Sequence, residues 1–180
     1  EILDAFLDLK EAGKIKNFGV SYFDADDLSE WLKLDGAEQT AVCENYFTLA
    51  YRKDENDLLP LCRKKGIPLI SYPRLAMYGK AFQDPVLKRI AADRGNTPAQ
   101  IALAWLFSHS GVGAFVTPSS HAEIRAYVDS QKITLKPDEL KALNARFPRP
   151  TKTVIRREPR ASFQQKPLPP IRGTDSLSKL

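Results

Sequence analysis

The stretch Ala114-Phe115-Val116-Thr117-Pro118-Ser119-Ser120-His121-Ala122-Glu123-Ile124-Arg125 decides the fold, because it is an apolar strand that passes through a proline into a helix. Ser120 and Glu123 have the S-x-x-E spacing of a capping box, in which the serine accepts from a first-turn N–H and the glutamate reaches back. Free N–H groups at such a helix start can hold a phosphate, and Arg125 adds a positive charge. The same spacing is also that of an ordinary capped helix without a ligand.

The strand-and-helix unit repeats upstream of this stretch. Apolar runs predict three further strands, at 15–21, 40–43 and 67–72, beside the strand at 114–117. Helical spacing of apolar residues predicts helices at 2–12, after Asp24, at 54–65, 84–94 and 97–108, after Ser120 and at 137–146. The helix at 97 has a second capping box, Thr97-Pro98-Ala99-Gln100. Buried strands that alternate with helices predict an α/β fold with a parallel sheet.

Strand spacing alone leaves two architectures open. Four such units form either an open sheet or half of an eight-stranded barrel, and both bind ligands at the carboxyl ends of their strands. Polar and aromatic residues gather at those ends here: Ser21-Tyr22, Glu44-Asn45-Tyr46, Ser71-Tyr72 and Thr117 to Ser120. The sequence therefore predicts a ligand site at this edge of the sheet.

Composition narrows the class of protein. The 180 residues are 43% hydrophobic and 27% charged, which is typical of a soluble globular protein. No apolar run has the length of a membrane span, so no membrane association is expected. The net charge of +5 is concentrated in 147–180 and leaves 1–146 nearly neutral, so no nucleic-acid binding is predicted. The chain starts with Glu1 inside a helical pattern, and we expect it to be a fragment.

Cysteines and histidines predict no metal site. Cys43 and Cys62 are far apart in apolar segments, and the chain has neither a C-x-x-C motif nor clustered histidines. We expect both cysteines to be core thiols. His109 and His121 are expected to be structural or surface residues.

Several motifs, in this order, resemble one known family. Lys10 to Phe23, K-E-A-G-K-I-K-N-F-G-V-S-Y-F, resembles its G-K-I-R-x-I-G-V-S-N-F, and S-Y-P-R-L-A-M-Y-G at 71–79 resembles its A-Y-S-P-L-x-x-G. Thr97 to Trp105 is similar to its T-P-A-Q-V-A-L-A-W, and V-T-P-S-S with Arg125 resembles its I-P-x-S. Residues 1–146 thus resemble the C-terminal half of an aldo-keto reductase, a (β/α)8 TIM barrel that uses NADPH. Tyr78-Gly79-Lys80-Ala81 favours the diketogluconate-reductase branch.

The resemblance implies contacts at the nicotinamide end of the cofactor. Tyr72 would stack on the nicotinamide ring, and Ser21 would hydrogen-bond its carboxamide. Cys43 stands where a glutamine usually binds the carboxamide, and Tyr22 replaces an asparagine that does the same. Leu75 would lie in the loop that covers the pyrophosphate.

The resemblance also implies contacts at the adenosine end. Ser119, Ser120 and Arg125 would hold the 2′-phosphate, with Ser119 in place of the common lysine. Asp129 falls where the family usually has an asparagine that contacts adenine. The weaker charge at Ser119 predicts a reduced affinity for NADPH or a relaxed cofactor preference.

None of the family's catalytic residues is expected within the chain. Its proton-donating tyrosine and the Asp, Lys and His partners lie in the half-barrel that would precede residue 1. We therefore predict the cofactor-binding part of an NADPH-dependent oxidoreductase that reduces a small aldehyde or ketone, inactive as this fragment alone. The alternative is a non-catalytic binding or scaffold protein that retains the half-barrel.

The segment 147–180 is predicted to be an extended tail. It is rich in proline and basic residues and has no helical or strand period. It ends in Ser178-Lys179-Leu180, which is a peroxisomal address in a eukaryote and is read by an import receptor. Under that hypothesis the protein is peroxisomal or glycosomal. If the source is bacterial, the ending is accidental and the protein is cytoplasmic.

Overall fold

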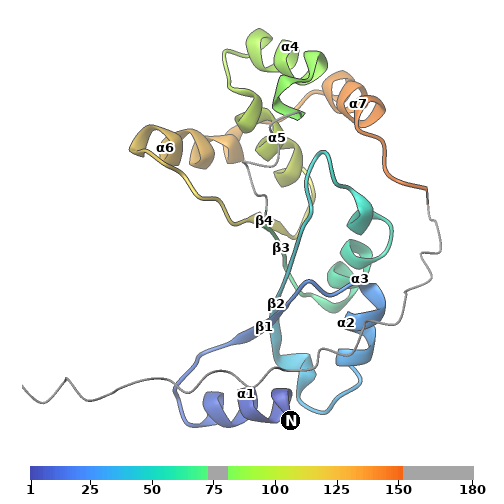
Figure 1. The fold of residues 1–180 in the computed structure, drawn as a ribbon, viewed down its shortest axis with the longest axis vertical. Coiled ribbons are helices and arrows are strands. Elements are labelled where there is room, and N and C mark those ends of the chain that lie inside the picture. The colour runs from blue at the N-terminus through green and yellow to red at the C-terminus, as the bar shows by residue number, and fades with distance from the viewer. Residues whose placement is uncertain (73–80, 152–180) are drawn as a thin grey trace, which may run out of the picture.

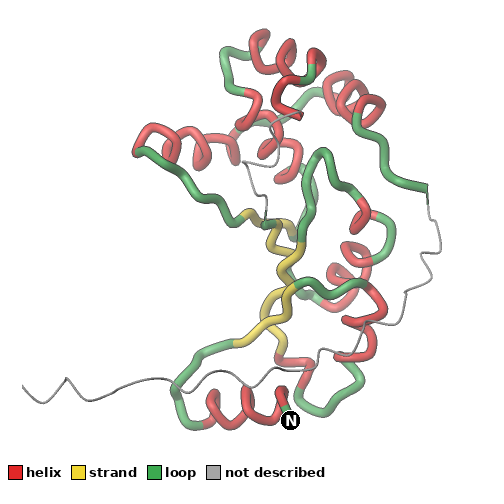
Figure 2. Tube along the Cα trace, in the orientation of Figure 1, coloured by secondary structure: helices red, strands yellow, loops and turns green. Residues whose placement is uncertain are grey.

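Four parallel strands form the centre of the molecule. The computed structural model describes residues 1–72 and 81–151. The strands pair in the order of the chain, β1-β2-β3-β4, and every pair is parallel. Figure 2 shows them crossing the middle of the molecule. Their bounds are β1 Phe18–Ser21, β2 Thr40–Asn45, β3 Leu69–Ser71 and β4 Val112–Ala114.

Helices lie around this sheet. In Figure 1, α2 and α3 lie on the same side of the strands, and α1 and α4 lie at opposite ends of the molecule. The α-helices are α1 Ile2–Glu11, α2 Ala25–Trp31, α3 Leu58–Lys65, α4 Pro85–Asp93, α5 Pro98–Phe107, α6 His121–Asp129 and α7 Pro137–Arg146. Short 3₁₀ turns are η1 Ala37–Gln39, η2 Lys53–Glu55, η4 Ala81–Gln83 and η5 Ser130–Lys132.

The topology is that of half a (β/α)8 barrel. Consecutive parallel strands are neighbours and helical segments connect them, as they do around a barrel. Of the described strands, β1 and β4 each have one partner. The β4 side is open: α6 has no fully buried residue, and Phe115, Ile124 and Val128 are about half exposed. The predicted half-barrel is confirmed, and the open four-stranded alternative gives way to it.

The main core is built around α5. All six residues from Ile101 to Leu106 are buried, so this helix is covered on every side. The Trp105 ring packs 5.7 Å from the Phe47 ring, between centroids. A smaller cluster of Leu3, Phe18 and Ala37 attaches α1 to the sheet, and there the Phe6 ring stacks on Phe18 at 5.4 Å. The sheet is thus fixed from both of its ends.

Helix ends follow the predicted capping residues in three places. The Asp24 side chain accepts from the N–H groups of Asp26 and Asp27, and Asp27 completes a capping box. Thr97 and Gln100 form the second predicted box. Gly66 ends α3 in the left-handed conformation, with φ of 69°.

Two predicted segments have different bounds in the structure. The helix expected from 54 to 65 begins only at Leu58, which keeps Pro60 in the first turn; a start at 54 would place Pro60 beyond that turn, where the helix needs its missing N–H. The strand expected at 114–117 lies at Val112–Ala114 instead. Its partner β3 ends at Ser71, and the last bond runs from the Phe115 N–H to the Ser71 carbonyl at 2.8 Å.

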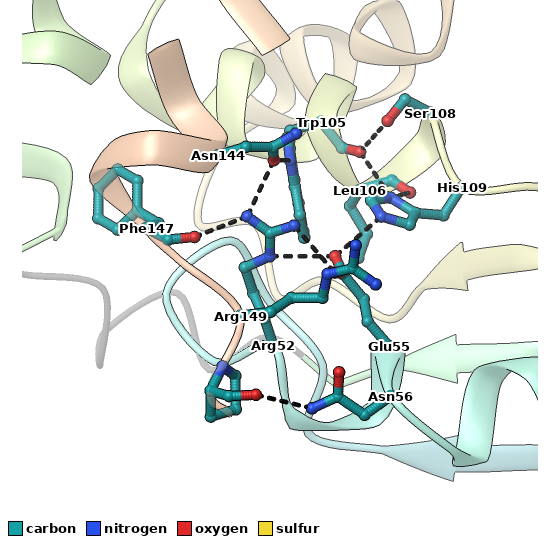
Figure 3. Close-up of polar contacts among 11 residues, drawn as sticks. Arg52, Glu55, Asn56, Trp105, Leu106, Ser108, His109, Asn144, Phe147 and Arg149 are labelled. Atoms are coloured by element: carbon teal, nitrogen blue, oxygen red, sulfur yellow. Dashed lines mark hydrogen bonds and ion pairs between the residues drawn. The ribbon is translucent and has the colours of Figure 1, made fainter. Parts of the chain in front are cut away.

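The start of the predicted tail is attached to the body. Arg52 donates to the Phe147 carbonyl at 2.6 Å, and Asn56 donates to the Pro150 carbonyl at 2.9 Å (Figure 3). Arg149 forms an ion pair with Glu55 at 3.0 Å. Residues 147–151 are therefore held in place, and the predicted address at Ser178-Lys179-Leu180 lies outside the described residues. No helix in the described ranges is long and apolar enough to cross a bilayer.

Candidate cofactor site

The carboxyl ends of the four strands lie at one edge of the sheet. Backbone hydrogen bonds continue the ladder to this edge: Tyr22 N–H to Glu44 C=O at 2.9 Å, Tyr72 N–H to Asn45 C=O at 2.9 Å, and Phe115 N–H to Ser71 C=O at 2.8 Å. The strand-end residues Ser21-Tyr22, Glu44-Asn45 and Ser71-Tyr72 therefore share one edge, as predicted, whereas Thr117 to Ser120 follow β4 in the segment that leads into α6. Ligands of α/β folds bind at this edge.

Tyr72 and Phe115 form an aromatic pair at the ends of β3 and β4. Their ring centroids are 5.5 Å apart and the rings are inclined by 29°. Tyr72 is half-buried, whereas Phe115 remains 53% exposed. The predicted stacking residue Tyr72 thus lies at the edge with an exposed aromatic neighbour. Leu75, predicted for the pyrophosphate loop, lies outside the described residues.

Cys43 does not face the candidate site. Its side chain is fully buried, and the hydrogen bond with Cys62 together with burial raises the pKa of the Cys43 thiol. Both cysteines are therefore core thiols, as their apolar surroundings predicted. In this structure the Cys43 thiol is buried and cannot contact a cofactor, so the carboxamide role that the resemblance implies for Cys43 is wrong.

Glu44, one of the strand-end residues that the sequence singles out, lies beside Ser21 at this edge. Successive side chains of a strand point to opposite faces, so Glu44 lies on the face opposite to buried Cys43. The register pairs Glu44 directly with Ser21, the other predicted carboxamide residue.

Tyr22 follows Ser21 in an unusual backbone conformation. Its φ is 58°, the only positive φ among the described non-glycine residues, and its side chain is 56% exposed. Asparagine adopts this left-handed region much more readily than tyrosine. The backbone thus explains why the resemblance places an asparagine here.

The start of α6 is capped, but not by the box that the sequence predicts. The Ser120 hydroxyl accepts from the Glu123 N–H at 3.2 Å, as expected. Glu123 reaches past Ser120 to Ser119, where its Oε2 accepts from the N–H at 2.6 Å and from the hydroxyl at 2.9 Å. Ser119 offers two donors where the Ser120 backbone offers one. These hydrogen bonds hold the pKa of Glu123 below its usual value.

Arg125 and Asp129 lie further along α6. The Arg125 side chain is exposed and makes no hydrogen bond or ion pair with any other described residue. Asp129 is exposed too, and its Oδ1 pairs with Lys132 Nζ at 2.7 Å. The predicted phosphate residues Ser119, Ser120 and Arg125 are therefore together at the first turns of one helix, and Asp129 lies one turn beyond Arg125.

The two histidines lie outside this edge cluster. His109 Nε2 contacts Glu55 Oε1 at 3.0 Å, and its Nδ1 lies 3.0 Å from the Trp105 carbonyl (Figure 3). His109 is thus a structural residue, as predicted, and His121 is the exposed first residue of α6. Within 1–72 and 81–151, no group of three His, Cys, Asp or Glu side chains is arranged to hold a metal ion.

Comparison with known proteins identifies the family. The model of the aldo/keto reductase family matches residues 1–146. Methylglyoxal reductase YeaE of Escherichia coli (strain K12) is 32% identical over 154 residues, which cover 83% of this chain and 54% of that protein. Methylglyoxal reductase DkgB of Escherichia coli O157:H7 is 33% identical over 147 residues, or 81% of this chain and 53% of that protein.

Solved structures agree with the sequence comparison. An aldo-keto reductase from Klebsiella pneumoniae in complex with NADPH superposes with a TM-score of 0.80 at 32% identity, covering 83% of this chain and 54% of that one. A putative 2,5-diketo-D-gluconic acid reductase B gives a TM-score of 0.68 at 27% identity. The chain spans about half the length of the relatives it matches. From the half-barrel and the match across residues 1–146, we conclude that this chain belongs to the aldo/keto reductase family.

Proposed function

We propose that this chain is the cofactor-binding portion of an NADPH-dependent oxidoreductase that reduces aldehyde or ketone carbonyls. The observation that carries the proposal is the superposition with TM-score 0.80 on an NADPH complex, which covers 83% of this chain. The relatives named methylglyoxal reductases suggest a small carbonyl compound as the substrate.

The residues at the edge suit the two ends of NADPH. Tyr72 would stack on the nicotinamide, and the hydroxyl of Ser21 would bind its carboxamide. The first turn of α6 would take the 2′-phosphate through N–H groups and hydroxyls, with Arg125 as the positive charge. NADPH supplies a hydride when bound. The chain's own residues hold and orient the cofactor.

The proton for the carbonyl oxygen would come from outside residues 1–180. In this proposal a tyrosine of the other half of the barrel donates it. The exposed Phe115, Ile124 and Val128 on the open β4 side support a further structural unit beside this one. The intact protein, rather than this chain by itself, is therefore the proposed enzyme.

A non-catalytic binding or scaffold role is the second candidate. It is favoured by the carboxamide site, where Tyr22 replaces an amide side chain and the thiol of Cys43 is buried. A scaffold has no need to orient a nicotinamide. The two candidates predict different behaviour towards NADPH.

Full-length natural protein distinguishes them. We expect it to quench NADPH fluorescence and to oxidise NADPH in the presence of methylglyoxal, with Tyr72→Ala binding less tightly. Lys33→Ala, which removes an exposed ion pair with Glu30 and is not one of the edge residues, is the control and should behave as wild type. Absence of both NADPH binding and turnover in the full-length protein would favour the scaffold.

A further inference from the structure

The carboxylate of Glu123 takes two hydrogen-bond donors immediately before α6. Its Oε2 accepts both the N–H and the hydroxyl of Ser119, at 2.6 and 2.9 Å. A carboxylate and a phosphate oxygen are alike as negatively charged acceptors. Glu123 therefore binds where an anion would bind at the start of α6.

Arg125 is not part of this internal contact. It makes no hydrogen bond or ion pair with other described residues, although it lies only two positions after Glu123. The positive charge of the proposed phosphate site is thus available while two of the site's donors are taken. An incoming 2′-phosphate would be attracted by Arg125 and repelled by the Glu123 carboxylate.

An analogous contact exists at the other end of the proposed site. The Phe115 ring packs against the Tyr72 ring at 5.5 Å, and Tyr72 is the residue proposed to stack on the nicotinamide. Phe115 and Glu123 both belong to the segment that leads from β4 into α6. Within this segment, Phe115 contacts the residue proposed for the nicotinamide ring, and Glu123 contacts a residue proposed for the 2′-phosphate.

We propose that Glu123 is a specificity-determining residue that competes with the 2′-phosphate for Ser119, so that NADPH binds only by displacing its carboxylate. This inference rests on the proposed function. NADH has no 2′-phosphate and leaves the Glu123 contact intact. Glu123 therefore lowers the ratio of NADPH affinity to NADH affinity, and removing its side chain raises that ratio.

Cofactor titration of the full-length natural protein tests the inference. We expect Glu123→Ala to bind NADPH on the order of tenfold more tightly, because a phosphate no longer displaces two hydrogen bonds to a charged group. NADH binding should stay within about twofold of wild type, since no contact to it changes. Glu123→Gln keeps the size and an acceptor but removes the charge, and we expect an intermediate gain for NADPH.

Glu30→Gln is the control for the loss of charge, because it removes one negative charge from an exposed side chain that pairs with Lys33 away from α6. An unchanged or weakened NADPH affinity in both Glu123 variants overturns the inference, and so does an equal gain for the two cofactors. The proposed function is judged separately. If wild type and variants bind neither cofactor, the proposed function is wrong and the inference falls with it; if wild type binds NADPH but the ratio does not move, only the inference is wrong.

Discussion

Arg52 and Glu55 form a doubly hydrogen-bonded ion pair inside the protein. Nε of Arg52 lies 3.0 Å from Oε1 of Glu55, and Nη2 lies 2.8 Å from Oε2. Both side chains are nearly inaccessible to solvent. Figure 3 shows that the pair lies between Trp105, His109 and the segment after α7. The guanidinium also lies 4.8 Å from the centre of the Trp105 ring, so the pair joins η2, α5 and the end of α7.

Removing one partner of this pair should destabilise the fold strongly. We expect Glu55→Ala to lower the free energy of unfolding by about 3–5 kcal/mol, because the buried Arg52 loses its counter-charge. Denaturant unfolding measures this change. Arg149→Ala is the control: Arg149 contacts the same Glu55 but is mostly exposed, so its loss should cost about 1 kcal/mol or less. Similar losses in the two variants would contradict the role given to the buried pair.

Asp54 predicts a dependence of stability on pH. Its side chain is buried, Oδ2 has no hydrogen-bond partner among the described residues, and burial raises its pKa from 3.8 to about 7. Between these two pKa values, Asp54 is protonated in the folded state and ionised in the unfolded state. This group's contribution to stability is therefore complete at low pH and falls as the pH rises from about 4 to about 7.

Asp54→Asn should remove that dependence. The wild type is expected to lose roughly 2–3 kcal/mol of unfolding free energy between pH 5 and pH 8 through Asp54. Asparagine does not ionise, so the unfolding free energy of the variant should not show this decrease between pH 5 and pH 8. Urea unfolding at several pH values measures it, and parallel pH profiles for wild type and variant would refute the assignment.

Gly19 allows β1 and β2 to approach closely. A Cβ at this position would lie 2.4 Å from Val42 Cγ1 and 2.6 Å from the Val42 carbonyl oxygen. The valine side chain can move aside, but the carbonyl belongs to the sheet. We expect Gly19→Ala to cost about 2 kcal/mol or more. Gly66→Ala is the comparison, since there a Cβ meets open space and only the left-handed φ is unfavourable, at about 1–2 kcal/mol.

Tyr22→Asn should improve both the backbone and the proposed cofactor site. Asparagine tolerates the left-handed conformation, so we expect a gain of about 0.5–1 kcal/mol in unfolding free energy. It also provides an amide beside Ser21, which should tighten NADPH and NADH alike. Tyr22→Gly separates the two effects, because it relieves the backbone without an amide. Equal cofactor affinities in the two variants would remove the binding role of this position.

Local sequence signals predicted most of the fold. The capping residues Asp24 and Thr97 and the left-handed Gly66 were identified correctly, because each acts through its own few neighbours. The bounds of β4 were wrong because they depend on where β3 ends. The residues at which β4 pairs with β3 cannot be predicted from the sequence of β4 alone.

The roles of the candidate site residues stay predictions, although part of their placement could be read from the sequence. Ser119 and Ser120 precede α6 and Arg125 lies in its second turn, since a helix start is a local feature. The burial of Cys43 was not foreseen at the carboxamide position, because the face of the sheet to which a side chain points changes with each residue of a strand. The reach of Glu123 to Ser119 depends on a side-chain conformation that spacing does not fix.

Cofactor binding by an Arg125→Ala variant of the full-length natural protein is the most direct test of the account. If the start of α6 holds the 2′-phosphate, NADPH affinity should fall roughly tenfold to a hundredfold, while NADH affinity stays nearly unchanged. Fluorescence titration with both cofactors gives the two dissociation constants. An equal loss for NADPH and NADH, or no loss for either, would contradict the phosphate role of this helix.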